Sequence, residues 1–209
     1  MMKERKVNIC GIDVIVFPKV YFPSDDTYML VDVINSLDRN YGCGLDLGCG
    51  CGILTLLLSK ICKQVIAIDI NSIAVKNTWY NAKLNFLSKK IHVIVGDLIN
   101  PIKRAPIFDI IVFNPPYLPA SEYDKYLFEE EKLSLCGGPN GRIIIDRFLN
   151  EFSSIIKNFS EVFILQSSLS NHMKTIEKLI NLGFNVSIVF EKKFFYEKLY
   201  LFKVTKNDC

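Results

Sequence analysis

The sequence predicts an α/β fold: a seven-stranded, mostly parallel sheet with an antiparallel edge strand and helices on both faces. Short apolar runs that are typical of buried strands alternate with longer segments whose apolar residues repeat every three or four positions. This alternation is typical of a parallel sheet, because each parallel connection needs a crossover, which is usually a helix. Near the C-terminus, residues 184–190 and 198–204 are joined by a short charged connection, which predicts an antiparallel pair at one edge.

The composition indicates one domain without a strong charge signature. The chain has 209 residues, 50% of them hydrophobic, and a net charge of +3, so we expect a single domain over residues 1–209. Residues 1–40 predict a small extension, and residues 41–209 predict the core of the domain. The mild charge argues against a nucleic-acid partner, and no apolar run approaches the roughly 18 residues of a membrane span.

The cysteines favour a reducing compartment. There are seven, an odd number, and none has the spacing of a zinc finger, so we expect reduced thiols in a cytoplasmic protein and no metal site. Cys43, Cys49 and Cys51 lie among glycines, where small residues suit tight packing.

The extension predicts a hairpin followed by a helix. Residues 7–10 and 13–17 are short apolar runs around Gly11, as in a small hairpin. Ser24 is a suitable N-cap for the helix, and two aspartates follow it, where the helix dipole favours negative charge. The apolar face of this helix comprises Leu30, Val33, Ile34 and Leu37.

Four apolar runs predict the central strands, and each leads into polar or glycine residues. The runs are residues 43–47, 65–70, 91–95 and 108–113. Helices connect them, one over residues 53–61 and one with an apolar face of Val75, Trp79, Ala82 and Phe86. The four strand ends carry, in order, Asp46 with Gly48, then Asp69, Asp97 and Asn114. Because ligands bind beyond the carboxyl ends of parallel strands, these residues predict one binding edge.

The rest of the chain predicts a long connection, two helices and one more strand before the C-terminal pair. Residues 117–141 form a polar connection of the length that is commonly functional, and its acidic run, residues 129–131, indicates a solvated face. The first helix repeats Ile145, Phe148, Leu149, Phe152 and Ile156. Residues 161–166 predict a strand, and a helix over residues 170–182 ends at Gly183.

The glycine loop and the acid after the second strand predict an adenosine-type ligand. Asp69 would accept hydrogen bonds from ribose hydroxyls, and its place 21 positions after Gly48 also matches the dinucleotide fingerprint. Three features favour S-adenosylmethionine over NAD. The loop has GxGxG spacing, Asp97 suits the adenine amino group, and an Asn-Pro-Pro-Tyr loop has no obvious use in hydride transfer.

The segment FNPPYLP, residues 113–119, predicts a stiff loop that can hold a planar nitrogen. Proline has no N–H and restricts the residue before it, so the strand stops abruptly. The loop then presents the Asn114 amide, backbone carbonyls that accept from an NH₂ group, and the ring of Tyr117. A rigid turn without further function is the alternative.

Together these motifs resemble the class I S-adenosylmethionine-dependent methyltransferases, which have a Rossmann-like sheet. The chain is most similar to the HemK-type protein-glutamine methyltransferases, in the eukaryotic and archaeal branch that acts on translation release factors. The resemblance rests on VYFPSDDTYML, DLGCGCG, the acid in AIDIN, GDL, NPPYLP and GGPNGRIIIDRF. The NPPY motif alone also occurs in DNA-adenine and RNA-guanine methyltransferases.

The resemblance implies methyl transfer from S-adenosylmethionine to a glutamine of a Gly-Gly-Gln motif, leaving S-adenosylhomocysteine. Asn114 and the Pro115 carbonyl would hold the substrate NH₂, and Tyr117 would pack against it. The residues around the cofactor would be Thr27, Asp46, Gly48, Gly50, Asp69, Asp97, Leu98 and Asn114, with Asp46 near the methionine amino group. The sequence departs from the family at Asp26, where glutamate is frequent, and just before Cys136, where some relatives have a bulky residue.

The expected mechanism is direct displacement by a well-positioned amide nitrogen. His92 falls within a strand and His172 within a helix, so both are expected to be structural, and Ser167 and Ser168 to cap a turn. Positioning and water exclusion would supply the catalysis. The alternatives are methylation of an RNA or DNA base amine, and a non-catalytic scaffold. Lysine methylation is a possible side activity that the resemblance suggests.

The resemblance also implies a small zinc-binding activator protein as a partner. Such activators add a strand beside the third strand, here residues 91–95. An exposed apolar sheet edge invites this pairing.

Overall fold

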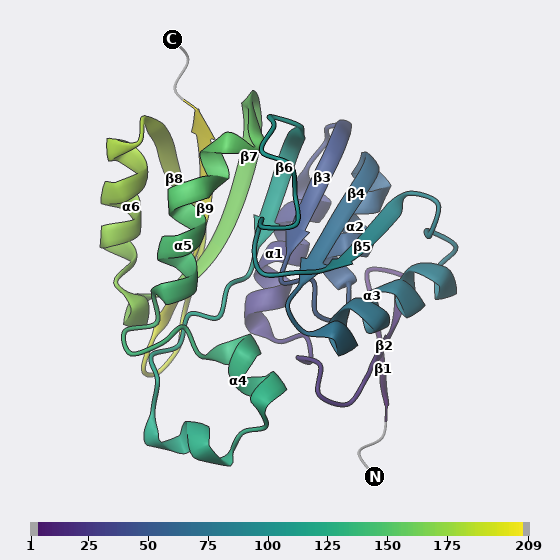
Figure 1. The fold of residues 1–209 in the computed structure, drawn as a ribbon, viewed down its shortest axis with the longest axis horizontal. Coiled ribbons are helices and arrows are strands. Elements are labelled where there is room, and N and C mark those ends of the chain that lie inside the picture. The colour runs from purple at the N-terminus through teal and green to yellow at the C-terminus, as the bar shows by residue number, and fades with distance from the viewer. Residues whose placement is uncertain (1–3, 207–209) are drawn as a thin grey trace. The chain divides into compact units, whose positions relative to one another are not determined.

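The computed structural model describes residues 4–206, except for the side chain of Tyr123. Its larger sheet has seven strands in the order β5-β4-β3-β6-β7-β9-β8, and β1 and β2 form a separate two-stranded sheet (Figure 1). The predicted fold class is confirmed. The chain divides into two compact units, with Ile102 as the last residue of the first and Lys103 as the first of the second. The single domain over residues 1–209 stays a prediction.

The first unit contains the hairpin and the first three strands of the larger sheet. Its elements are β1 (Arg5–Ile9), β2 (Ile12–Val16), α1 (Asp25–Ser36), β3 (Tyr41–Leu47), α2 (Ile53–Ile61), β4 (Cys62–Asp69), α3 (Ser72–Leu84) and β5 (Ile91–Val95). β4 pairs in parallel with β3 on one side and with β5 on the other. The inward residues of these strands, such as Leu45, Val65 and Ala67, are buried, as the apolar runs predict.

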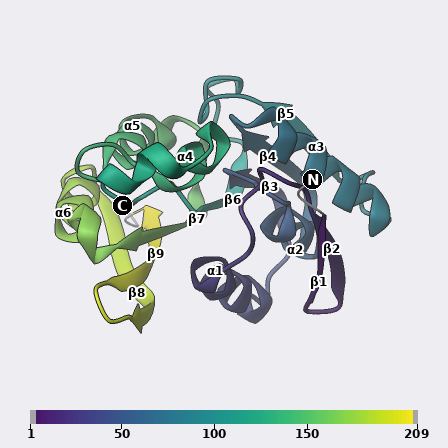
Figure 2. The same cartoon turned by 90° about the horizontal axis from the view of Figure 1, so that it is seen from below.

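The second unit carries the other four strands. Its elements are β6 (Phe108–Phe113), η1 (Glu122–Tyr126), α4 (Glu129–Leu135), α5 (Ile143–Glu151), η2 (Phe152–Ser154), β7 (Ile156–Ser167), η3 (Ser168–Ser170), α6 (His172–Asn181), β8 (Phe184–Lys193) and β9 (Lys198–Lys206). β6 and β7 are parallel, whereas β9 is antiparallel to both β7 and β8. The antiparallel pair therefore lies at one edge, as predicted, with β8 outermost. α5 and α6 lie side by side on the same side of these strands (Figure 2).

Two predicted helical faces extend too far. Phe86 is 94% exposed, because α3 ends at Leu84 and the chain turns with a positive φ of 59° at Phe86. Ile156 is buried, but it begins strand β7 instead of continuing α5. In both cases an apolar residue at helical spacing follows a break in the helix, which periodicity alone does not reveal.

The long connection after β6 is partly helical. Glu129, Glu130 and Glu131 form the first turn of α4, where the Glu131 carboxylate accepts a hydrogen bond from the Phe128 N–H at 2.9 Å. The acidic run therefore starts a helix, in agreement with the preference of helix N-termini for negative charge.

Three asparagines spaced four residues apart, two on α3 and one at its C-cap, bind the edge of β2 and the residue that follows it. Asn81 accepts from the Ile15 N–H at 3.0 Å and donates to the Ile15 carbonyl at 2.8 Å. Asn77 pairs in the same way with Phe17 N–H and Ile15 carbonyl, and Asn85 donates to the Asp13 carbonyl. Four helical residues rise about 6 Å and two strand residues about 6.7 Å, so the amides match every second residue of β2. The side-chain amides thus bond to the hairpin where a neighbouring strand would otherwise pair.

Asn81→Leu tests this arrangement. We expect the free energy of unfolding to fall by about 3 kcal/mol, because the change removes the acceptor of the Ile15 N–H and the side-chain donor of the Cys51 carbonyl, and leaves the Ile15 carbonyl with Asn77 alone. Urea unfolding measures the loss. Lys76→Ala, an exposed change on the same helix, is the control. Equal stabilities of the two variants would contradict the pairing.

Candidate functional site

The glycine loop after β3 has left-handed backbone and an open side. Gly48, Gly50 and Gly52 have φ values of 70°, 54° and 88°, which favour glycine. At Gly52 an added Cβ would lie 2.9 Å from the Thr78 side chain, whereas at Gly50 it would meet no atom within 4 Å. The Thr78 hydroxyl also donates to the Gly50 carbonyl at 3.0 Å. Gly52 is therefore required by packing, and Gly50 leaves space that a ligand can approach.

Asp46 is a fully buried carboxylate at the end of β3. Its Oδ2 accepts a hydrogen bond of 2.5 Å from the Thr55 hydroxyl. Its Oδ1 is buried and has no hydrogen-bond partner among the residues that the structure describes. Burial, with a smaller contribution from the charge of Asp69, raises the pKa of Asp46 to about 7, although Thr55 opposes the shift. A buried acceptor of this kind suits an ammonium group of a ligand.

Asp69, at the end of β4, joins the glycine loop to the start of α3. Its Oδ2 accepts from the Gly50 N–H at 2.9 Å, and its Oδ1 accepts from the Asn71 N–H at 2.8 Å. Burial raises the pKa of Asp69, while the backbone N–H groups of Gly50 and Asn71 oppose that shift. A carboxylate oxygen can accept more than one hydrogen bond, so Asp69 keeps the capacity to bind hydroxyl groups.

The start of α1 is organised around Asp26. Its Oδ1 accepts from the Thr27 N–H at 2.6 Å and from the Thr27 hydroxyl at 3.2 Å, and both oxygens are 3.2 Å from the Tyr21 hydroxyl. Burial and the charge of Asp26 raise the pKa of Tyr21. Ser24 precedes the helix as predicted, but its side chain does not cap it. Thr27 is thus buried and fixed in place.

The turn after β5 is tied to Asp69. The Gly96 N–H donates to the Asp69 backbone carbonyl at 2.9 Å. Asp97 and Leu98 follow, half-buried, and Leu98 has a positive φ of 50°. The first unit therefore brings the ends of β3, β4 and β5 together, as the pattern of strand ends predicts.

In the second unit, Asn114, Pro115 and Tyr117 directly follow β6. Pro115 is buried, and Asn114 and Tyr117 are half-buried. The loop is anchored beyond these residues, where the Leu118 N–H donates to the Leu135 carbonyl at 3.0 Å. Before the loop, the ring of Phe113 packs against Phe148, with centroids 4.7 Å apart. The predicted stiff loop therefore has support on both sides.

The other titratable candidates have structural contacts. His92 Nε2 lies 2.8 Å from Gln64 Oε1, and the His172 ring stacks on Tyr200 at 4.1 Å. Ser167 accepts from the Leu169 N–H, which confirms its role in capping a turn. Over residues 4–206, no group of three or more His, Cys, Asp or Glu side chains has an arrangement that could hold a metal ion.

The six cysteines within the described part of the chain are free thiols, and Cys49 and Cys51 are buried in the glycine loop. Burial raises the pKa of both thiols, as expected of small residues used for packing. The seventh, Cys209, lies outside the described residues.

Sequence reasoning missed two residues that support the site. Thr55 interrupts the apolar run over residues 53–58 in α2, and that isolation is the signal that could have identified it. Arg142 lies in the GGPNGRIIIDRF motif, but the sequence does not reveal that it is buried and bonded to distant backbone carbonyls.

Comparison with known proteins assigns a family to this arrangement. Residues 24–170 match the family described as methyltransferase small domain. A Methanocaldococcus jannaschii protein named "Putative protein N5-glutamine methyltransferase" is 38% identical over 197 residues, covering 92% of this chain and 95% of its own. A release factor glutamine methyltransferase of Rhodopirellula baltica is 28% identical over 79% of this chain, which spans only 60% of that relative.

Among solved structures, the E. cuniculi Mtq2-Trm112 complex, which methylates the termination factor eRF1, has a similar fold. The TM-score is 0.71 at 25% sequence identity, covering 90% of this chain and 99% of the other. None of the helices within residues 4–206 has the length and apolar character needed to cross a membrane.

Proposed function

Because this chain belongs to the methyltransferase small domain family, we propose that it methylates the side-chain amide nitrogen of a glutamine in a protein. The methyl donor is S-adenosylmethionine, and the substrate is the Gly-Gly-Gln motif of a class 1 translation release factor in the cytoplasm. The observation that carries the proposal is the Asn-Pro-Pro-Tyr loop at the end of β6, in a chain that matches a protein named as a glutamine methyltransferase over nearly all its length.

The first unit fits the cofactor. S-adenosylmethionine supplies an electrophilic methyl group when bound. Asp46 Oδ1, buried without a donor among the described residues, accepts a hydrogen bond from the ammonium group of the cofactor. Asp69 accepts hydrogen bonds from the ribose hydroxyls. The open side of Gly50 admits the ligand next to the backbone. Thr27, Gly48, Asp97 and Leu98 of the same unit supply the remaining cofactor contacts.

The loop after β6 holds the substrate amide. Asn114 Oδ1 and the Pro115 carbonyl accept the two N–H bonds, and Tyr117 packs against the amide plane. An amide nitrogen is a weak nucleophile because its lone pair is delocalised, so orientation and exclusion of water supply the catalysis. The amide proton leaves during or after transfer.

Asp46 gives the cofactor assignment a pH signature. Since its pKa in the fold is about 7, above the usual 3.8, the stability that its neutral form contributes is lost as the pH rises between these values. A bound ammonium favours the carboxylate instead, so ligand binding expels a proton. We expect S-adenosylhomocysteine to release about half a proton at pH 7. Calorimetry in buffers of different ionisation enthalpy measures this number. Asp46→Asn should release none, and equal release from both proteins would refute the assignment.

Labelled S-adenosylmethionine separates this function from methylation of a base amine. The substrates are a release factor, its Gln→Ala variant in the Gly-Gly-Gln motif, and total RNA. We expect label only in the unaltered release factor. Label in RNA would favour the nucleic-acid alternative, which the NPPY motif permits and the net charge of +3 does not favour.

The edge of the first unit suits an activator subunit. Within residues 4–206, β5 has no strand partner other than β4, so its other edge has none, and Val95 is 54% exposed. A small zinc-binding protein that adds a strand here would supply hydrogen-bond partners for the backbone groups of this edge. A purified chain that is monodisperse and fully active alone would contradict the need for such a partner.

A further inference from the structure

The segment Gly137–Arg142, which the proposed function leaves unused, packs against the loop after β6. The Gly137 N–H donates to the Leu118 carbonyl at 2.8 Å, and the Ala120 N–H donates to the Gly138 carbonyl at 2.8 Å. These two bonds lie on either side of Pro119 and join the segments like a short ladder. The end of the Asn114–Tyr117 loop is therefore held by backbone bonds to this segment.

Two glycines make this close approach possible. A Cβ on Gly137 would lie 2.6 Å from the Pro116 carbonyl oxygen, closer than real side chains come. A Cβ on Gly141 would overlap the Tyr117 carbonyl oxygen and lie 2.9 Å from Ser170 Cβ. Any side chain at either position would displace the carbonyls of the Asn-Pro-Pro-Tyr loop.

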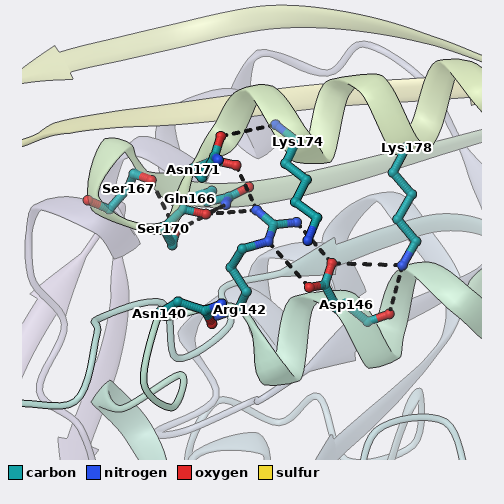
Figure 3. A network of polar contacts seen from close by, with 9 residues as sticks. All are labelled: Asn140, Arg142, Asp146, Gln166, Ser167, Ser170, Asn171, Lys174 and Lys178. Atoms are coloured by element: carbon teal, nitrogen blue, oxygen red, sulfur yellow. Dashed lines mark hydrogen bonds and ion pairs between the residues drawn. The ribbon is translucent and has the colours of Figure 1, made fainter.

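Arg142 fastens the other end of this segment. Its Nη1 donates to the carbonyls of Ser170 and Asn171, each at 2.7 Å. On its other side, Nη2 donates to Asp146 Oδ1 at 2.9 Å and Nε donates to Oδ2 at 3.3 Å (Figure 3). The guanidinium is buried, so four fixed acceptors determine its position.

The acceptors of Arg142 are themselves held in place. The Gln166 amide donates to the Ser170 carbonyl at 2.8 Å and lies 3.0 Å from the Ser170 hydroxyl. Lys178 of α6 forms an ion pair with Asp146 at 3.7 Å, as Figure 3 shows. Although partial burial of Asp146 acts against it, Arg142 and Lys178 lower the pKa of this carboxyl, which stays ionised at neutral pH.

We infer that Gly137–Arg142 positions the Asn114–Tyr117 loop for methyl transfer. Gly141 lies between the Tyr117 carbonyl and Ser170. The hydrogen bond from Arg142 to the Ser170 carbonyl holds the Ser170 turn against Gly141. Arg142 is thus a positioning residue, which acts on substrate geometry through Gly141. The inference rests on the proposed function for its catalytic consequence, but the mechanical link between the two segments holds without it.

Gly141→Ala and Gly183→Ala form a matched pair that tests the link. Both glycines have a positive φ, 69° and 82°, so alanine strains the backbone in each, but only at Gly141 does the new Cβ meet the loop. Amide hydrogen exchange reports the loop directly through the N–H groups of Leu118, Ala120 and Gly137. We expect exchange to be at least about tenfold faster in Gly141→Ala and unchanged in Gly183→Ala.

The kinetic readout separates positioning from a general structural role. We expect kcat on the release factor to fall about 100-fold in Gly141→Ala, because a displacement of about 1 Å has such an effect. The Kd for S-adenosylhomocysteine should stay within about twofold, since its proposed contacts lie mainly in the first unit. Arg142→Lys should show the same pattern more weakly, and it serves as the test if Gly141→Ala does not fold.

Unchanged exchange and kcat in folded Gly141→Ala or Arg142→Lys protein, or equal effects in Gly183→Ala, would overturn the inference. If the wild-type chain methylates no glutamine, the proposed function fails. The exchange rates then still decide whether Gly137–Arg142 holds the loop.

Discussion

Replacing Asn114 by alanine is expected to abolish methyl transfer while leaving cofactor binding nearly intact. Asn114 follows β6 directly and is proposed to accept one of the two N–H bonds of the substrate amide. Removing one such pre-oriented partner lowers kcat by about 10²- to 10³-fold in other enzymes. We expect a loss at the upper end, about 10³-fold, because orientation is the main source of catalysis proposed here.

Single-turnover kinetics with a release factor measures this loss, and calorimetry with S-adenosylhomocysteine measures the Kd. Asn114→Asp keeps an acceptor oxygen of similar size, so it should retain more activity than Asn114→Ala. A kcat within about tenfold of wild type in Asn114→Ala would remove this residue from the catalytic set. A tenfold change corresponds to only about 1.4 kcal/mol of activation free energy, far less than the expected loss.

Replacing Asp69 by alanine is expected to weaken cofactor binding about 100-fold. The change removes the proposed acceptor of the ribose hydroxyls, and hydrogen bonds to a charged group contribute about 1.5–3 kcal/mol each. It also removes the acceptor of the Gly50 N–H at 2.9 Å and of the Asn71 N–H at 2.8 Å, so the glycine loop loses its anchor.

Equilibrium binding of S-adenosylhomocysteine measures this effect. Asp32→Ala, which removes an exposed carboxylate from α1, is the control and should bind like wild type. A Kd for Asp69→Ala within about threefold of wild type would mean that Asp69 only anchors the loop.

The strands of both units follow directly from local sequence. The runs over residues 91–95 and 108–113 coincide with β5 and β6. β6 is almost entirely buried, and a parallel strand that is covered on both faces needs apolar residues on both. The helix over residues 53–61 coincides with α2 for a similar reason, since glycines precede it and its residues are almost all buried. The polar strand ends then indicate the ligand side.

The remaining features depend on contacts between distant residues. Phe86 has the spacing of a core residue, but the turn after Leu84 exposes it. Asn77 and Asn81 look like solvated polar residues in the sequence, yet they are fully buried because β2 supplies their partners about 60 residues away. Arg142 likewise looks like a surface residue until the carbonyls of Ser170 and Asn171 surround it.

The central claim is that the acceptor of the methyl group is a glutamine side-chain nitrogen. Tandem mass spectrometry of a release factor, incubated with this chain and S-adenosylmethionine, locates the added methyl group. The account predicts the methyl group on the glutamine of the Gly-Gly-Gln motif, and no modification when Asn114→Ala replaces the wild-type chain. A methyl group on another residue of the release factor, or transfer only to RNA in the same mixture, would contradict it.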